Sequence, residues 1–326
     1  MSAPAIRALK EWAPGATLTL FTRPQNLPFA SRLSYIDAVE EADVSWIRPD
    51  SSGLANLKAC FRLAGRIRRG GYDLAVDLRY HNRLDSLLLS LCGARWRLGF
   101  DAGGFGFGVT HCAAWPREGH ETGRQADALR SQGIPADGRA EVFPLGRREV
   151  DAAAAMIGAR RPVVAIHPGA GNEIKRWMPE RFAWVARELS RKCGVRIAVL
   201  AGRGEESLGK PILDAVPARS RIDLRGSLSL PQMAAVLAKS RLLIGNDGGA
   251  AHVAASVGTP TLVVFSGTSL AGEWAPRGGM ARVIEKWVPC KPCHSTNCPF
   301  GSACLRAVGV DEVFSAAVRM LRSARR

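Results

Sequence analysis

The chain has 326 residues, of which 47% are apolar and 23% are charged, and its formal net charge is +16. The composition is ordinary for a globular protein, and the length exceeds what one hydrophobic core usually organises, so we expect two medium-sized domains. The longest apolar runs fall far short of the roughly 20 residues that cross a bilayer, and residues 1–12 lack the apolar region of a signal peptide. We therefore expect a soluble, cytoplasmic protein.

Most of the positive charge lies in the second half of the chain. Residues 1–150 carry 20 Lys and Arg against 16 Asp and Glu, whereas residues 151–326 carry 25 against 13. A basic surface attracts any polyanion, including nucleic acid, anionic lipid, phosphorylated glycans and nucleotides. Because the Arg residues are scattered and no helix-turn-helix, RNP or zinc-finger pattern is present, the sequence argues against a nucleic-acid-binding protein.

Short aliphatic runs alternate with longer amphipathic stretches along the chain, which is typical of βα units that build parallel sheets. The first half is predicted to contain strands at Thr17–Phe21 and Leu74–Leu78 and helices at Ala3–Trp12, Gly53–Arg69 and Leu84–Cys92. Gly103–Gly108 follows no apolar strand and is predicted to be a loop, not a dinucleotide fingerprint. Arg147–Arg161 is predicted to be a helix or linker, and the domain boundary is placed between residues 155 and 156.

The strand signals are sharper in the second half. The predicted strands are Val163–His167, Arg196–Ala201, Leu242–Gly245 and Thr261–Phe265, and the predicted helices are Glu180–Lys192, Leu230–Ser240 and Ala250–Val257. A turn that contains glycine follows each strand. This pattern predicts a doubly wound domain over residues 156–326, and such domains bind ligands at the carboxyl ends of their strands.

The turn after the first of these strands has the composition of an anion-binding loop. It reads HPGAGNEIKRWMPERF. Gly169 and Gly171 let the backbone approach a ligand, and Lys175 and Arg176 add positive charge. A plain loop with solvated cations is the alternative, but this combination at a strand end favours an anion site.

Two later turns carry further signals of ligand binding. AGRGEE places Glu205 beyond a strand end, where a carboxylate can accept hydrogen bonds from a ribose or base, although a solvated helix-start residue is an equal alternative. Asp247, Gly248 and Gly249 lie where backbone N–H groups and the positive end of a helix favour a diphosphate. His252 follows within one helical turn, which favours a ligand contact over core packing.

Four of the eight cysteines lie close together near the C-terminus. They are Cys290, Cys293, Cys298 and Cys304, with His294 among them. Without an export signal, metal binding or a reduced thiol cluster is expected rather than a disulfide framework. The density suits tetrahedral zinc, but only the first pair has the Cys-x2-Cys spacing, so a structural zinc ion and a reduced cluster both stay open.

Taken in order, HPGAG, KRWMPERF, AGRGEE, GNDGGAAHVAASVGTP and FSGT resemble the donor-binding domain of glycosyltransferase family 9, the ADP-heptose:lipopolysaccharide heptosyltransferases. The first half resembles the family more weakly, through SAPAIRALKEWAPGATLTL and YDLAVDLRYHNRLDSLLLSLCGARWRLGF. The resemblance implies an α/β GT-B fold with two Rossmann-like domains, an acceptor-side domain at residues 1–155 and a nucleotide-sugar domain at residues 156–326. It implies transfer of heptose, or a related sugar, from an ADP-sugar to a lipopolysaccharide core acceptor.

By this resemblance Lys175 contacts phosphate, Glu205 contacts the nucleoside, and the Asp-Gly-His set contacts the diphosphate. The expected donor site is Lys175, Gly169, Glu205, Asp247, Gly248, Gly249, His252 and Thr268. The family commonly has Thr or Ser where this chain has Gly248, so backbone N–H groups are expected to replace a hydroxyl contact there.

The diphosphate that leaves during sugar transfer carries charge that must be neutralised. Many glycosyltransferases use a divalent metal on an Asp-x-Asp motif, and this sequence contains no Asp-x-Asp. We therefore predict metal-independent transfer without a cofactor, in which Lys175, backbone N–H groups and a helix dipole neutralise the diphosphate. The resemblance implies that the transfer is inverting.

An inverting transferase also needs a general base. In the family this is an Asp in a Gly-Asp turn after the first strand, and SAPAIRALKE at the start of this chain resembles the segment that follows the turn. We therefore expect the first strand and the catalytic Asp to lie before Met1. The alternative is a non-catalytic nucleotide-sugar-binding protein, which is disfavoured because loss of a central strand exposes two strand edges.

On the acceptor side, Arg79, His81 and Arg83 form a basic turn after the strand LAVDL. The turn suits a phosphorylated, lipid-linked glycan, which would bring the protein to the inner membrane as a peripheral partner, although a solvated helix start is the alternative. A GT-B transferase that uses a different nucleotide-sugar donor is also left open.

Overall fold

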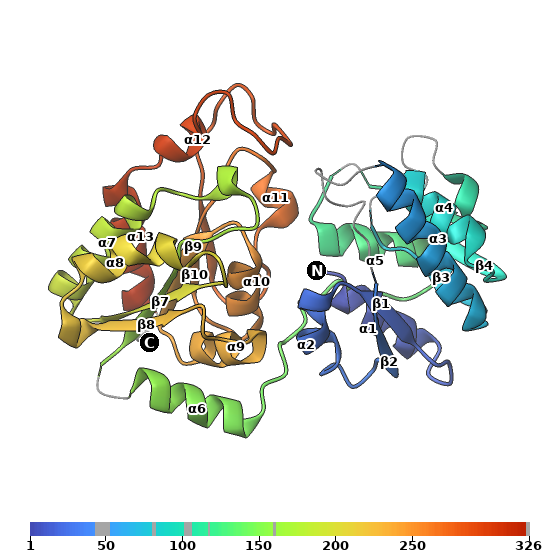
Figure 1. The fold of residues 1–326 in the computed structure, drawn as a ribbon, viewed down its shortest axis with the longest axis horizontal. Coiled ribbons are helices and arrows are strands. Elements are labelled where there is room, and N and C mark those ends of the chain that lie inside the picture. The colour runs from blue at the N-terminus through green and yellow to red at the C-terminus, as the bar shows by residue number, and fades with distance from the viewer. Residues whose placement is uncertain (43–52, 80–82, 101–105, 117, 159–160, 324–326) are drawn as a thin grey trace. The chain divides into compact units, whose positions relative to one another are not determined.

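The computed structural model describes residues 1–42, 53–79, 83–100, 106–116, 118–158 and 161–323, and within these no helix is both long enough and apolar enough to cross a membrane. The chain divides into two compact units, residues 1–140 and 141–326 (Figure 1). The predicted boundary between residues 155 and 156 lies further along the chain. Helix α6 (Arg147–Ile157) accounts for the difference, because it packs Ala153 and Ile157 into the core of the second unit.

The second unit contains a six-stranded parallel sheet in the order β11-β10-β9-β6-β7-β8. Its strands are β6 (Val163–His167), β7 (Arg196–Ala201), β8 (Arg221–Arg225), β9 (Leu242–Asn246), β10 (Thr261–Val264) and β11 (Ala281–Ile284). After α6, its helices are α7 (Pro179–Cys193), α8 (Lys210–Ala215), α9 (Leu230–Ala238), α10 (Gly249–Ser256), α11 (Ala271–Trp274), α12 (Ala303–Arg306) and α13 (Val310–Ser323). The doubly wound domain predicted from the sequence is confirmed.

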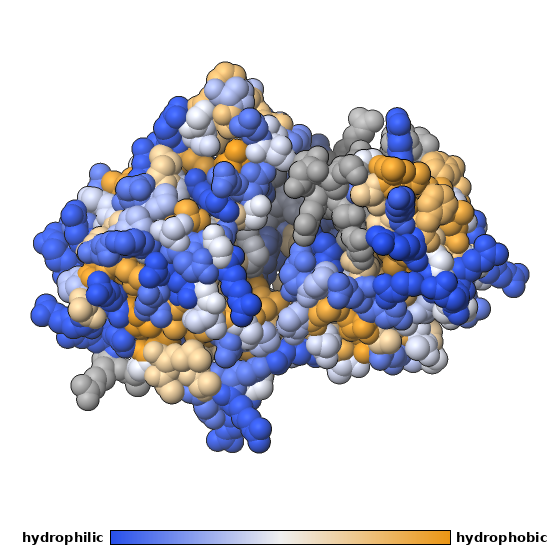
Figure 2. Space-filling model, in the orientation of Figure 1, coloured by the Kyte–Doolittle hydropathy of each residue, from blue (hydrophilic) through white to orange (hydrophobic). Residues whose placement is uncertain are grey.

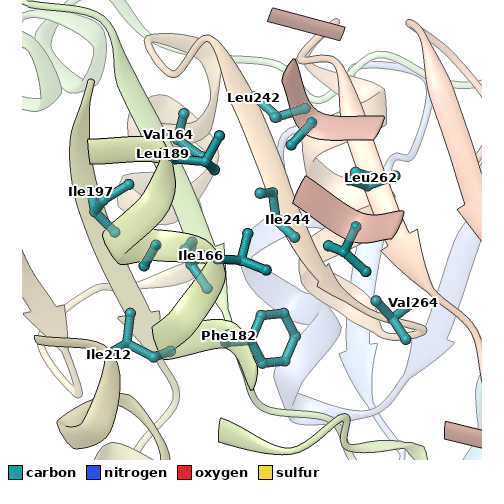
Figure 3. Packing of buried hydrophobic residues seen from close by; sticks show 14 of the residues in the cluster. Val164, Ile166, Phe182, Leu189, Ile197, Ile212, Leu242, Ile244, Leu262 and Val264 are labelled. Atoms are coloured by element: carbon teal, nitrogen blue, oxygen red, sulfur yellow. The ribbon is translucent and has the colours of Figure 1, made fainter. Parts of the chain in front are cut away.

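Strand β6 shows how the sheet separates two hydrophobic layers. Val164 and Ile166 point into the cluster formed with α7, α8 and α13, whereas Val163 and Ala165 belong to the cluster formed with α6, α9 and α10. Successive side chains of a strand point to opposite faces of the sheet, and a parallel strand covered on both faces is apolar throughout. Figure 3 shows Ile166 near Phe182 and Val164 near Leu189, and both of these partners belong to α7.

The helices of this unit begin and end at residues with suitable backbone preferences. Helix α7 has Pro179 in its first turn and ends at Gly194, whose φ of 64° is left-handed. Helix α9 begins with a capping box, in which the Ser229 N–H donates to Gln232 Oε1 at 2.8 Å. Local sequence therefore sets the ends of the helices that flank the central strands.

The first unit contains two separate parallel sheets, one in the order β1-β2 and the other in the order β3-β4-β5. The strands are β1 (Thr19–Thr22), β2 (Ala38–Glu41), β3 (Leu74–Val76), β4 (Trp96–Phe100) and β5 (His111–Ala113). The helices are α1 (Ala3–Trp12), α2 (Leu27–Ala30), α3 (Gly53–Arg69), α4 (Arg83–Leu91) and α5 (Glu121–Ser131). Within the described residues, β1 pairs only with β2, and β3 pairs only with β4.

Several predicted elements have the observed bounds, among them α1, α3, β6 and β7. Sequence reasoning missed the short strands β2, β4, β5, β8 and β11. Strand β2 shows why, because its sequence AVEE is only half-buried and lacks a long apolar run. In the predicted glycine loop, residues 103–105 lie outside the described part of the chain and Gly106–Gly108 form one 3-10 turn.

Hydrophilic residues are spread over the visible faces of both units, with smaller apolar patches between them (Figure 2).

Replacement of Ile166 by Ala should destabilise the second unit by about 2–5 kcal/mol, because it leaves a cavity beneath a fully buried side chain. The control is Leu54→Ala on α3, where the side chain is 66% exposed and the expected loss is below about 0.5 kcal/mol. Urea denaturation of the three proteins measures both effects. Equal losses in the two variants would contradict the assignment of this core.

Candidate functional site

The candidate site lies where the order of strands reverses in the sheet of the second unit. From β6 the chain moves outward through β7 and β8, and it then returns to the other side of β6 to form β9, β10 and β11. The carboxyl ends of β6 and β9 are therefore neighbours at a topological switch point, the usual ligand position in doubly wound sheets. The first and third turns predicted from the sequence follow these two strands.

The buried side chain of Asn246 joins these two turns. Its Nδ2 donates to the Pro168 carbonyl at 2.7 Å, and its Oδ1 accepts from the Trp177 N–H at 2.9 Å. Both backbone groups belong to the turn that follows β6, and the Trp177 side chain is fully buried. Sequence reasoning missed this role, although a polar amide at the end of an otherwise apolar strand was the available signal.

Lys175 and Asp247 form an ion pair across the switch point. Lys175 Nζ lies 2.6 Å from Asp247 Oδ2, and 28% of the lysine side chain and 5% of the aspartate side chain are exposed. The two residues come from the first and third predicted turns, so the structure brings together two predicted site residues that are far apart in sequence. Asp247 is thus placed to orient the lysine, which keeps part of its surface in solvent.

Glu205, from the second predicted turn, also contacts the first predicted turn. Arg176 Nη2 donates to Glu205 Oε1 at 3.0 Å, and Arg176 Nε donates to the Ala170 carbonyl at 3.1 Å. Glu205 also explains Gly169, because a Cβ at this glycine would lie 2.2 Å from Glu205 Oε2. A Cβ at position 169 would therefore force the Glu205 carboxylate to move.

Gly248 precedes α10 in an extended conformation, with φ −172° and ψ 179°, and Gly249 is the first residue of that helix. A Cβ at Gly248 would have its nearest neighbour at 3.9 Å, so the fold has room for Ser or Thr at this position. Compared with the Ser or Thr that the family commonly has at this position, Gly248 therefore lacks a hydroxyl group, although the fold has space for one. His252 lies in the first turn of α10 and is half-buried.

The turn after β10 presents a small group of hydroxyls. Thr268 is buried, and its Oγ1 lies 2.8 Å from Ser266 Oγ. The Ser269 Oγ is buried and has no hydrogen-bond partner in the part of the chain that the structure describes. An unpaired buried hydroxyl is costly unless a ligand or water completes it, so Ser269 joins the candidate site, where sequence reasoning did not place it.

Two of the four clustered cysteines, Cys293 and Cys304, contact this turn. The Cys304 Sγ accepts from the Gly267 N–H at 3.3 Å, and the Cys293 and His294 N–H groups donate to the carbonyls of Gly267 and Thr268. The Cys298 Sγ accepts a local backbone hydrogen bond. Across the described residues, no group of three or more His, Cys, Asp or Glu side chains is placed to hold a metal ion, and this includes the predicted possible zinc site at Cys290, Cys293, Cys298 and Cys304.

Of the predicted acceptor-side residues, Arg79 is held by two carboxylates. Its guanidinium contacts Asp77 at 3.1 Å and the buried Asp85 at 2.5 Å. Burial opposes the charge of Arg79, but Asp77 and Asp85 outweigh this effect and raise its pKa. Arg83 is exposed at the start of α4, and His81 lies outside the described residues.

Comparisons of the sequence with known proteins all find heptosyltransferases. Residues 60–304 match the family described as glycosyltransferase family 9 (heptosyltransferase). Lipopolysaccharide heptosyltransferase 3 of Escherichia coli (strain K12) is 24% identical over 302 residues, which cover 88% of this chain and 83% of the relative. Lipooligosaccharide heptosyltransferase 2 of Haemophilus influenzae is 29% identical over 119 residues, which cover 35% of this chain and 34% of the relative.

Two solved structures share the fold over nearly the whole chain. A family 9 glycosyl transferase from Veillonella parvula has a TM-score of 0.81 at 19% identity and covers 99% of this chain and 93% of its own. The E. coli ADP-heptose lps heptosyltransferase II has a TM-score of 0.76 at 18% identity, with 100% and 95% covered. These similarities confirm the predicted α/β fold of GT-B type.

The site should become less stable in mild acid because of His167, the last residue of β6. Burial lowers the pKa of His167, and Glu205 opposes this only in part. The unfolded chain therefore takes up a proton below the ordinary pKa of 6.5 before the folded protein does, so the free energy of unfolding falls there by at most about 1.4 kcal/mol per pH unit.

Urea denaturation at pH 7.5 and 5.5 tests this effect. His167→Gln should show a smaller loss of stability on acidification than the unmodified protein. His111→Gln, at an exposed position, should behave like the unmodified protein. An unchanged loss in His167→Gln would show that other groups cause the acid sensitivity.

Proposed function

Because this chain belongs to glycosyltransferase family 9, we propose that it transfers heptose, or a related sugar, from an ADP-linked donor to a lipopolysaccharide core acceptor. Enzymes of this family are glycosyltransferases, and several relatives carry the name heptosyltransferase. The ion pair between Lys175 and Asp247 at the switch point is the observation that carries it.

The diphosphate of the donor fits beside Lys175 and the start of α10. The lysine is oriented by Asp247 but remains partly exposed, so its ammonium group can contact a phosphate without leaving its carboxylate partner. Gly248 and Gly249 bring the backbone of α10 close to the same place, and the positive end of the helix favours an anion. The buried Ser269 hydroxyl supplies a further group that a bound ligand could satisfy.

Glu205 suits the nucleoside end of the donor. Its Oε1 is bonded to Arg176, while Oε2 faces Gly169 at the end of the neighbouring turn. A carboxylate beyond the second strand of such a sheet commonly accepts from ribose hydroxyls. The contact with Arg176 holds the carboxylate in position before the nucleoside binds.

The proposed reaction is inverting and requires neither a metal ion nor another cofactor. The sequence contains no Asp-x-Asp motif, and Lys175 together with the α10 backbone is positioned to neutralise the leaving diphosphate. A donor-binding protein without turnover and a transferase with another nucleotide sugar are the competing functions.

We propose a phosphorylated, lipid-linked glycan as the acceptor, which would place the protein at the inner face of the cytoplasmic membrane. The formal charge of +16 favours an acidic acceptor and an anionic membrane surface. Nucleic acid is not a proposed partner.

Lys175→Met tests the donor site. Removal of one charge-assisted contact to phosphate should weaken ADP binding about 10–100-fold, measured by calorimetry. Lys210→Met is the matched control, because Lys210 pairs with Asp214 on an exposed helix face and should leave the affinity unchanged. Equal affinity in the unmodified and Lys175→Met proteins would refute this donor site.

The reaction itself is tested with ADP-heptose, UDP-sugars and GDP-sugars on a truncated lipopolysaccharide core, in the presence and absence of EDTA. We expect transfer from the ADP-sugar, an inverted anomeric centre by NMR and no inhibition by EDTA. Transfer from a different nucleotide sugar would favour the alternative donor, and ADP-sugar binding without transfer by any form of the protein would favour the non-catalytic alternative.

Gly169→Ala tests the packing of Glu205 against the first turn. The added methyl group would displace the carboxylate, so ADP affinity should fall by about tenfold or more. Gly171→Ala in the same turn is the control, because a Cβ there meets no atom within 4 Å. If both variants bind ADP as tightly as the unmodified protein, the position of Glu205 does not matter for the nucleoside.

A further inference from the structure

Helix α3 of the first unit buries one side and exposes the other. On the buried side, Cys60 and Leu63 pack in a cluster with Leu88 of α4, which lies beside α3 (Figure 1). The Cys60 Sγ donates to the Leu84 carbonyl at 3.5 Å, so the helix is held against the start of α4. Residues spaced by three, four or seven positions share one side of a helix. The residues between those of the buried side therefore form a separate, solvent-facing side of α3.

The solvent-facing side of α3 combines basic and large apolar side chains, and we call it the α3 surface. Its residues follow one another at helical spacing and are all exposed: Leu54, Lys58, Phe61, Arg62, Arg68 and Arg69. Leu54 is 66% exposed and Phe61, seven residues later, is 52% exposed. No Asp or Glu occurs in α3. Four cations and two large apolar side chains therefore share about one-third of the circumference of the helix.

The positive charge of the first half of the chain is concentrated around this helix. Residues 53–100 carry nine Lys and Arg against three Asp, an excess of six. Residues 1–150 together have an excess of only four, so the rest of this half is acidic on balance. Arg79 holds two of the three carboxylates in the basic segment. The position of the excess therefore decides which side of the first unit attracts an anionic partner.

The cations of the α3 surface are available to such a partner. Within the part of the chain that the structure describes, Lys58, Arg68 and Arg69 form no ion pair with a carboxylate. Arg66, on the flank of the helix, differs because its guanidinium lies 2.7 Å from Glu40. Long basic side chains can keep their charged ends in a polar layer while their stems cover apolar surface.

The turn before β4 extends the α3 surface. The Arg68 side chain passes close to Gly93, because a Cβ at this glycine would lie 2.8 Å from Arg68 Cγ. Two residues later, the Arg95 guanidinium lies 4.9 Å from the ring centre of Trp96, and Trp96 is 44% exposed. Trp side chains are enriched where an apolar phase meets water, because one part of the ring system is apolar and the other is polar. The end of α3 and this turn together present further cations and an exposed aromatic ring.

This combination fits an anionic lipid surface better than a nucleic acid. Anionic headgroups attract the cations, and the two apolar side chains Leu54 and Phe61 can enter the boundary between headgroups and acyl chains, as they do in interfacial helices. A nucleic-acid backbone would neutralise the cations but leave both apolar side chains in water. Attraction by a few cations and two apolar side chains predicts reversible binding that weakens as salt is added.

We propose that the α3 surface, extended by Arg95 and Trp96, docks the protein on the anionic phospholipid surface of a membrane. The inference rests on the proposed function, because a lipid-linked acceptor has to be reached from a membrane. The predicted acceptor-side residue Arg83 begins α4, and α4 packs against α3. A bilayer that contacts α3 therefore holds the lipid end of an acceptor near that residue.

Flotation with lipid vesicles tests the α3 surface on the full chain. The charge variant is Lys58→Gln/Arg68→Gln/Arg69→Gln. The matched control is Arg219→Gln/Lys239→Gln/Arg322→Gln, which removes three exposed cations from the second unit and gives the same net charge. The vesicles contain phosphatidylcholine alone or phosphatidylcholine with about one-third phosphatidylglycerol.

The unmodified protein and the control should bind the anionic vesicles and dissociate as NaCl is raised. The charge variant should bind about 100-fold more weakly, because each cation near an anionic surface adds to the attraction. Leu54→Ser/Phe61→Ser should bind about tenfold more weakly with the same dependence on salt, because it loses apolar contacts and no charge. All of these side chains are exposed, so the urea midpoints of the variants should match that of the unmodified protein.

Three results would overturn the proposal. They are flotation of the charge variant and the apolar variant at the level of the unmodified protein, equal binding of the unmodified protein to neutral and anionic vesicles, and binding to poly(U) RNA without binding to vesicles.

ADP affinity and transfer to a water-soluble core acceptor, measured on the same proteins, separate this proposal from the proposed function. Loss of vesicle binding in the two α3 variants with ADP affinity and transfer intact supports the α3 surface. If none of the proteins binds ADP but only the α3 variants lose vesicle binding, the proposed function fails and the α3 surface is still supported.

Discussion

The side chain of Asn246 holds the candidate site together. One amide group, buried at the end of β9, accepts from the Trp177 N–H and donates to the Pro168 carbonyl, so both ends of the turn after β6 are held at one point. An unpaired amide in this position would carry a large desolvation cost, and the two hydrogen bonds remove it. Lys175 and Arg176 lie on the turn between these bonds, and their positions depend on it.

The charges of the site are balanced by carboxylates from two other turns. Lys175 is paired with Asp247 and Arg176 with Glu205, so each cation of the first turn has a partner from a different strand end. Fixed cations bind an anion more strongly than mobile ones, because their side chains lose less conformational freedom on binding. The arrangement therefore suits an enzyme that neutralises a diphosphate with its own side chains and backbone.

The two units differ in how their sheets are built. The central strands β6 and β9 of the second unit are buried on both faces and build two continuous hydrophobic layers. In the first unit the two sheets are covered by two smaller clusters, one around α1 and α5 and one around α3 and α4. A central strand such as β6 or β9 places side chains in both hydrophobic layers, so it ties the helices on the two faces of the sheet to the same backbone.

The sequence alone determined the βα alternation, the bounds of several helices and central strands, and the three turns at strand ends. These features depend on local periodicity, on the positions of glycine and proline, and on the order of motifs, all of which can be read directly from the sequence. Only the tertiary structure decided that Lys175 pairs with Asp247, that Asn246 joins two turns, and that Arg79 is held by carboxylates. It also placed Cys293 and Cys304 against the turn after β10. Such contacts join residues far apart in the chain, and their geometry follows from the packing of the whole sheet and its helices.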